Sequence, residues 1–271
     1  MQPNKIKAKM RQGKLALGTS VSLADPAVVE IIGLAGFDAA FIDMEHTSID
    51  LSMVEGMIRA CDVTGIASLV RVPDNNPKGI LRVLDAGAQG IQVPHIASVE
   101  DALAAVKAVR YAPLGERGMA GSSRAARYGA VPLKDHMATS NAEIVLAVMV
   151  EDKEAIDQLA EIAAIPGVDL IAIGPNDLSA ALGVTDPYDP LLKRTIDNMV
   201  ATLRRVGKAR MAFPLGIAAY PLSARELQSM GVAYANCNPY DARRLLLSYR
   251  QQVQEIQTEL GEHFKPESVP G

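Results

Sequence analysis

Short apolar runs recur along the chain, and each is followed by a longer segment in which apolar residues stand three and four positions apart. The runs predict strands buried on both faces, and the longer segments predict amphipathic helices. The strands are predicted at 15–21, 39–43, 67–72, 90–94, 144–150, 170–173, 209–213 and 232–236. The helices are predicted at 26–35, 52–63, 77–86, 99–109, 152–165, 190–206 and 224–230, with a last long helix from 241.

Eight strands alternating with eight helices predict an α/β fold of the (β/α)8 class, a TIM barrel. An open doubly wound sheet is the alternative. The length of 271 residues is normal for one barrel. We expect a single domain over residues 1–261, including the last helix, and a loose tail at 262–271.

Composition and charge narrow the class of protein. Aromatic residues make up 4% of the chain and Trp is absent, so aliphatic side chains must form the core. The formal charge of −4 and the pI near 5.6 argue against nucleic acid or an anionic membrane as partners. No apolar run approaches the length of a bilayer span, and none follows the basic N-terminus as a secretory signal requires. Cys61 and Cys237 are far apart, so we expect reduced thiols in a cytoplasmic protein.

In a TIM barrel, catalytic groups lie where the strands run into the following helices. Polar candidates follow five of the predicted strands at this rim. They are Asp43, Glu45 and His46 after the second strand, Arg71 closing the third, His95 after the fourth, and Glu151 and Asp177 after the fifth and sixth.

Two of these carboxylates belong to one strand-helix-strand unit. Glu151 ends the run 144–150, and Asp177 follows the run 170–173. A crossover helix makes the two strands parallel, so both carboxylates emerge at the same edge of the sheet. Converging carboxylates suit Mg²⁺ or Mn²⁺. The alternative is that Glu151 caps the next helix and Asp177 lies in an ordinary turn.

A second candidate group is Asp43, His46 and Arg71. A lone His after a strand is commonly structural, but here Asp43 is near enough in the sequence to orient and stabilise an imidazole that acts as a base. Arg71 adds a fixed cation on the same rim, suited to a carboxylate or a developing alkoxide.

Two further features have more than one interpretation. Residues 111–141 contain no predicted strand and are rich in Gly, Ser and Arg, including Arg117, Arg124 and Arg127. This segment is either a functional loop that reaches an active site or a solvated surface loop. The last helix carries an apolar seam that packs on its own barrel or on a partner chain, and we favour the partner. The seam consists of Leu246, Tyr249, Val253, Ile256 and Leu260.

Several motifs together resemble one enzyme family. They are F-I-D-M-E-H at 41–46, V-R-V-P at 70–73, R-Y-A-P-L-G-E-R-G at 110–118, V-M-V-E at 148–151 and I-G-P-N-D-L-S-A-A-L-G at 173–183. In this combination and order, the chain resembles the HpcH/HpaI aldolases, the metal-dependent class II pyruvate aldolases of the 2-dehydro-3-deoxyglucarate and 4-hydroxy-2-oxoheptanedioate type. The resemblance implies a TIM barrel, commonly a homo-hexamer built as a trimer of dimers, with the last helix exchanged between subunits. It also implies reversible cleavage of a 4-hydroxy-2-oxo acid to pyruvate and an aldehyde.

The resemblance assigns roles to individual residues. Glu151 and Asp177 would bind the divalent ion, Mg²⁺, Mn²⁺ or Co²⁺, and the backbone of Gly174, Pro175 and Asn176 would bind the carboxylate of the keto acid. His46, paired with Asp43, would be the base. Arg71 would bind the substrate and stabilise the pyruvate enolate. Asp85 matches a catalytic position near a subunit boundary.

The chain also departs from the family pattern. Many members carry Gln two residues before the metal-binding Glu, where this chain has Met149, and the seventh and eighth strands differ as well. Substrate identity is therefore the least transferable property. Alternatives are related enolate chemistry, such as oxaloacetate decarboxylation or lyase action on a larger acid, Schiff-base aldolase chemistry, and a non-catalytic keto-acid-binding protein.

Overall fold

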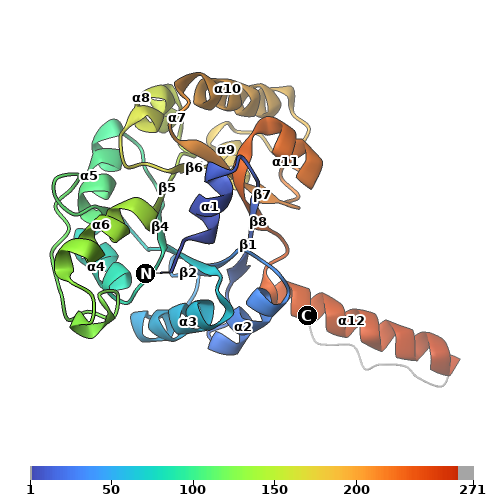
Figure 1. Cartoon of the computed structure of the whole chain (residues 1–271). Coiled ribbons are helices and arrows are strands. Elements are labelled where there is room, and N and C mark those ends of the chain that lie inside the picture. Colours follow the sequence, from blue (N-terminus) through green and yellow to red (C-terminus); the bar gives the residue numbers. More distant parts are fainter. Residues whose placement is uncertain (1, 262–271) are drawn as a thin grey trace.

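The strands form one closed parallel barrel (Figure 1). The structure is a computed structural model and describes residues 2–261. The expected tail at 262–271 lies outside these residues. The strands are β1 (Ala16–Val21), β2 (Ala39–Asp43), β3 (Ala67–Arg71), β4 (Gly90–Val93), β5 (Val145–Met149), β6 (Leu170–Ala172), β7 (Arg210–Leu215) and β8 (Val232–Cys237). Each strand pairs with the next and β8 closes on β1, which confirms the predicted barrel and excludes the open sheet.

Helices surround the barrel in the predicted order (Figure 1). They include α2 (Pro26–Leu34), α3 (Leu51–Thr64), α4 (Pro77–Asp85), α5 (Val99–Val109), α10 (Pro190–Val206), α11 (Ala224–Met230) and α12 (Asp241–Leu260). The predicted helix at 152–165 is divided into α7 (Lys153–Asp157) and α8 (Leu159–Ala164). A short turn of 3-10 helix, η1 (Arg127–Gly129), follows α5.

Two helices after β1 were not predicted. The first is α6 (Leu133–Glu143). Its sequence is polar and lacks an apolar stripe, and its only buried residues are His136 and Ser140. The second is α9 (Pro175–Ala181), which begins directly after β6 with a proline at its first position. α9 matters for the site because Asp177 lies in its first turn.

The barrel interior is filled by alternate residues of the strands, including Phe41, Leu69, Ala147 and Tyr234. A short N-terminal helix, α1 (Lys5–Arg11), lies across one end of the barrel and buries Ile6 completely among them (Figure 1). This plug covers the amino-terminal end of the strands, so the carboxyl end is the one open to a ligand.

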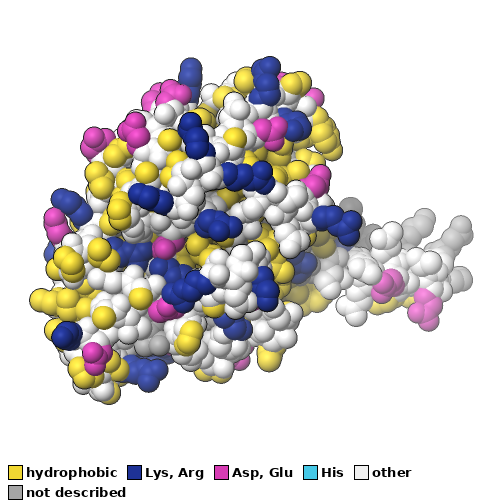
Figure 2. Space-filling view, turned by 45° about the horizontal axis from the view of Figure 1, so that its top comes forward, with side chains coloured by type: hydrophobic (Ala, Val, Ile, Leu, Met, Phe, Trp, Pro, Cys, Tyr) yellow, Lys and Arg dark blue, Asp and Glu magenta, His cyan; other side chains and the backbone are white. Residues whose placement is uncertain are grey.

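α12 leaves the body of the molecule and projects away from it (Figure 2). None of its residues is buried, and its apolar seam is between 44% and 59% exposed. The alternative that the seam packs on its own barrel is therefore wrong. Within residues 2–261, no helix is both long enough and apolar enough to span a bilayer.

The segment 111–141 is not simply a solvated loop. Arg117 is buried, with its guanidinium 4.5 Å from the ring centre of Tyr111 and 2.8 Å from a carboxylate oxygen of Asp85. Arg124 forms an ion pair with Asp62. These two arginines hold the segment against α3 and α4 at the amino-terminal end of the barrel, so they do not reach the carboxyl rim of their own chain.

Candidate active site

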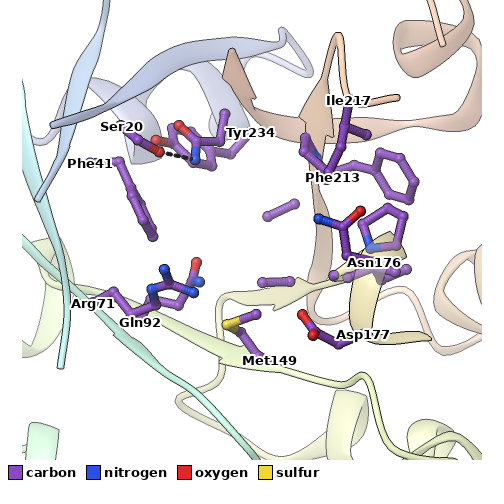
Figure 3. A pocket seen from close by; sticks show the side chains of 17 residues that line it. Ser20, Phe41, Arg71, Gln92, Met149, Asn176, Asp177, Phe213, Ile217 and Tyr234 are labelled. Carbon is purple, nitrogen blue, oxygen red and sulfur yellow. Dashed lines mark hydrogen bonds between the residues drawn. The ribbon is translucent and has the colours of Figure 1, made fainter. Parts of the chain in front are cut away.

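A cavity of about 150 Å³ opens at the carboxyl end of the barrel (Figure 3). Side chains from all eight strands or the turns after them line it, at the end where the sequence predicted a site. Its lining includes Ser20, Phe41, Arg71, Gln92, Met149, Gly174, Asn176, Asp177, Phe213, Ile217, Tyr234 and Asn236.

Glu151 and Asp177 converge on one side of Gly174. A Cβ atom placed on Gly174 would lie 2.6 Å from Oε2 of Glu151 and 3.4 Å from Oδ2 of Asp177. Glu151 is only 3% exposed, and its Oε2 atom has no hydrogen-bond partner among residues 2–261. Burial and the nearby charge of Asp177 raise the pKa of Glu151 to about 7.

This arrangement fits a divalent cation. The negative charge of Asp177 opposes ionisation of Glu151, and a cation between the two carboxylates would remove this repulsion. The Oε2 atom of Glu151, which has no partner among residues 2–261, is available as a ligand. Among the described residues, no three His, Cys, Asp or Glu side chains are grouped to hold a metal. The other ligands would therefore come from substrate and water, as is usual for Mg²⁺.

Arg71 and Asp43 are paired neighbours on β3 and β2. The guanidinium donates from Nε to Oδ1 of Asp43 at 2.9 Å and from Nη2 to Oδ2 at 2.5 Å. Burial raises the pKa of the Asp43 carboxyl, but the hydrogen bonds and charge of Arg71 outweigh burial and hold that pKa below its ordinary value.

The expected pairing of Asp43 with the His46 imidazole is wrong in this structure. Asp43 Oδ1 instead accepts hydrogen bonds from the backbone N–H groups of Glu45 (3.0 Å) and His46 (3.4 Å). The reason is the strand register, which places Arg71 opposite Asp43 and gives it the carboxylate. The imidazole is 69% exposed, and its Nε2 atom lies 3.6 Å from Glu45 Oε2.

Glu45 and His95 connect the Arg71–Asp43 pair with the Glu151 carboxylate. Glu45 lies 2.9 Å from Arg71 Nη1 and 3.1 Å from His95 Nε2. The Nδ1 atom of His95 is 3.4 Å from Glu151 Oε1. His95 has a φ of 51°, a strained backbone for a residue other than glycine. Glu45 and His95 both follow strands at the rim. This position was the only signal for them in the sequence, and it did not indicate a role for either residue.

The opposite wall of the cavity holds polar residues that the sequence did not single out. Asn236 donates to Ser20 Oγ at 2.8 Å, and its own Oδ1 atom is buried without a partner among residues 2–261. Tyr234 is 1% exposed, and its hydroxyl is likewise unpartnered there. The inward alternation along β8 was the available signal, since positions 234 and 236 face the same side of the strand.

Asp85 is not brought to this cavity. It ends α4 at the amino-terminal end of the barrel, where it binds Arg117. Within one chain it is on the opposite end from Glu151, because α4 runs antiparallel to the strands. Its catalytic role stays a prediction and requires the site of a neighbouring copy.

The fold and the site together place two converging carboxylates, a carboxylate-bound arginine and two histidines at the carboxyl rim of a parallel barrel. Comparison with known proteins identifies the class. The model of the HpcH/HpaI aldolase/citrate lyase family matches residues 17–212. The 5-keto-4-deoxy-D-glucarate aldolase of Citrobacter koseri is 38% identical over 218 residues, covering 80% of this chain and 82% of that protein.

Solved structures agree with this match. An HpcH/HpaI aldolase from Desulfitobacterium hafniense superposes with a TM-score of 0.85 at 27% identity and covers 96% of this chain and 98% of its own. An HpcH/HpaI aldolase/citrate lyase family protein from Burkholderia cenocepacia gives a TM-score of 0.82 at 32% identity, covering 93% and 99%. The chain belongs to the HpcH/HpaI aldolase/citrate lyase family. Its relatives make it an aldolase, an enzyme of the carbon-carbon lyase class.

Proposed function

We propose that this aldolase requires a divalent metal ion and cleaves a 4-hydroxy-2-oxo acid reversibly to pyruvate and an aldehyde. The observation that carries the proposal is the buried, unpartnered carboxylate oxygen of Glu151 facing Asp177 on the rim of the cavity. Such a pair is costly to a protein that binds no cation there, because burial and like charge both oppose ionisation.

Glu151 and Asp177 would hold Mg²⁺, Mn²⁺ or Co²⁺. When bound there, such an ion would supply Lewis acidity toward the ketone of the substrate. The substrate carboxylate would bind at Gly174, Pro175 and Asn176. Because Pro175 has no N–H, the donors there are the amides of Gly174, Asn176 and Asp177. The last two lie in the first turn of α9 and have no intrahelical partner.

His46 would act as the base. In cleavage its imidazole accepts the proton of the C4 hydroxyl, the C4–O bond becomes the aldehyde carbonyl, and the C3–C4 electron pair passes to the keto acid as an enolate. Protonation of the enolate at C3 gives pyruvate. Arg71, fixed by Asp43 and Glu45, would stabilise the negative charge that develops on the enolate oxygen.

The aldehyde portion would lie against the opposite wall, where Phe213 and Ile217 are apolar and Ser20 and Asn236 are polar. A wall with both characters suits a hydroxylated carbon chain. Together with the relatives named 5-keto-4-deoxy-D-glucarate aldolase, it favours a keto acid derived from a sugar acid as the substrate.

The deciding experiment is a screen of aldehydes with pyruvate and Mn²⁺, with products identified by mass. We expect carbon-carbon bond formation that EDTA abolishes and Mg²⁺, Mn²⁺ or Co²⁺ restores. Borohydride with pyruvate should leave no adduct, since no lysine of residues 2–261 lines the cavity. A borohydride-trapped adduct together with EDTA-resistant turnover would refute the metal mechanism, and metal-dependent release of CO₂ from oxaloacetate without aldol products would favour decarboxylation.

We also propose that the enzyme is a homo-oligomer in the cytoplasm, a hexamer built as a trimer of dimers. The exposed seam of α12 supports an interface between copies, since a row of apolar residues on a projecting helix is unfavourable in water.

A further inference from the structure

Gln92, on β4, carries a buried side-chain amide that makes no hydrogen bond with any of residues 2–261. The residue is only 6% exposed, and it lines the cavity at the carboxyl end of the barrel. Its terminal amide atoms are not among the fully enclosed polar atoms, so they open into the cavity. A protein amide without a partner in such a place is unfavourable unless something else hydrogen-bonds to it.

The strand register determines what lies beside this amide. Gln92 pairs with Arg71 on β3 and with Ala147 on β5. Ala147 and Met149 both lie in the apolar cluster inside the barrel, so the Gln92 side chain stands between Arg71 and Met149 on the inner wall (Figure 3). Met149 has only a thioether to offer, and a thioether cannot donate a hydrogen bond.

Packing alone does not account for glutamine at this position. The neighbouring inner positions Leu69, Ala147 and Met149 are apolar, and a leucine or methionine would fill the same space without an unpaired amide. Arg71, the nearest charged group on the adjacent strand, has its guanidinium bound to Asp43 and Glu45. The amide of Gln92 therefore remains available to a ligand that enters beside Arg71.

We propose that Gln92 binds the substrate directly and donates a hydrogen bond from its side-chain NH₂ group to the ketone oxygen of the keto acid. This inference rests on the proposed function. That oxygen gains negative charge when the enolate forms, so the amide and Arg71 would stabilise the same atom from adjacent strands. Gln92 is then a substrate-binding residue whose contribution grows as the reaction proceeds.

Exchange of the methyl protons of pyruvate for deuterium tests the proposal, because it reports enolate formation and needs no aldehyde. The parent enzyme with Mg²⁺ and pyruvate in D₂O should catalyse this exchange, followed by NMR. Gln92→Met, which keeps the size and removes the donor, should lower the exchange rate at least tenfold. Gln92→Glu, which keeps the shape and presents an acceptor, should do the same and decides the question if the methionine variant does not fold.

Gln89→Met is the matched control. Gln89 precedes β4 at the other end of the barrel and donates its amide to the backbone of Gln2. It should lower thermal stability and leave the exchange rate within twofold of the parent. If the Gln92 variants also stay within twofold while the parent exchanges pyruvate, Gln92 does not bind the ketone oxygen. If the folded, Mg²⁺-loaded parent itself shows no exchange, the proposed function fails and this inference with it.

Discussion

Arg71 stands opposite Asp43 in the register of β3 against β2, and two hydrogen bonds join its guanidinium to that carboxylate. The same carboxylate accepts hydrogen bonds from the backbone of Glu45 and His46, so one side chain fixes both the guanidinium of Arg71 and the turn that carries His46. The two side chains are 14% and 11% exposed, which makes this a buried ion pair.

Replacing Asp43 by Asn should therefore lower the stability of the protein as well as its catalytic rate. One acceptor is lost and Arg71 keeps a buried charge, so the free energy of unfolding should fall by about 3 kcal/mol, the usual cost of breaking a buried pair. Urea unfolding measures this, and Asp50→Asn is the control, because Asp50 is an exposed helix cap that Asn can replace. Equal stability of the two variants would show that Asp43 does not hold Arg71.

Glu151 should make the stability of the metal-free enzyme depend on pH. Its folded-state pKa is about 7 against an ordinary value of 4.5, because of burial and the charge of Asp177. The native state thus holds a proton that the unfolded chain releases, and the free energy of unfolding should decrease as pH rises from 4.5 to 7. With EDTA present, the Glu151→Gln variant should lack this decrease in the free energy of unfolding. Unfolding curves recorded between roughly pH 5 and pH 8, the range in which the shifted pKa acts, would measure it. A variant with the same pH profile as the parent would contradict the assignment.

Gly174 should be required for metal binding rather than for folding. Its φ of −96° is open to any residue, but a Cβ atom there would lie 2.6 Å from Glu151 Oε2. Gly174→Ala should therefore displace the Glu151 carboxylate and weaken Mn²⁺ binding at least tenfold, measured by calorimetry. Gly79→Ala, in α4, is the control. Its new methyl group would make only an ordinary contact with Asn76 Cβ at 3.9 Å, so this variant should bind Mn²⁺ as the parent does. Unaltered affinity in Gly174→Ala would mean that Glu151 is not a ligand.

His46→Ala should separate binding from chemistry. The imidazole is largely exposed and makes no hydrogen bond to Asp43, so its loss should leave the fold and pyruvate affinity intact. The rate of aldol cleavage should fall by about 10²–10⁴, the range for loss of a general base. Calorimetric pyruvate titration with Mn²⁺ and a steady-state assay give the two quantities. Turnover within tenfold of the parent would assign the base to another group.

The fold was predictable because eight continuous apolar runs left few alternatives for the strands. Two features of the helices were not predictable, because no apolar pattern signals them. They are the division of 152–165 into α7 and α8 and the polar helix α6. The rim residues were predictable from their position after the strands. Their pairings were not, because strand register, which gives Asp43 to Arg71 instead of His46, is a property of the closed barrel.

The apolar seam of α12 should determine the oligomeric state. Val253 and Ile256 are each 44% exposed on a helix that has no buried residue, so a carboxylate at either position is harmless to the barrel. In an interface between copies, the same carboxylates would be buried without partners, which is strongly unfavourable. The double variant Val253→Glu and Ile256→Glu should therefore dissociate the assembly with little change in secondary structure. Gln251→Glu and Gln252→Glu, off the seam, should leave it assembled. Sedimentation velocity distinguishes the two, and a seam variant that sediments as the parent does would remove α12 from the interface.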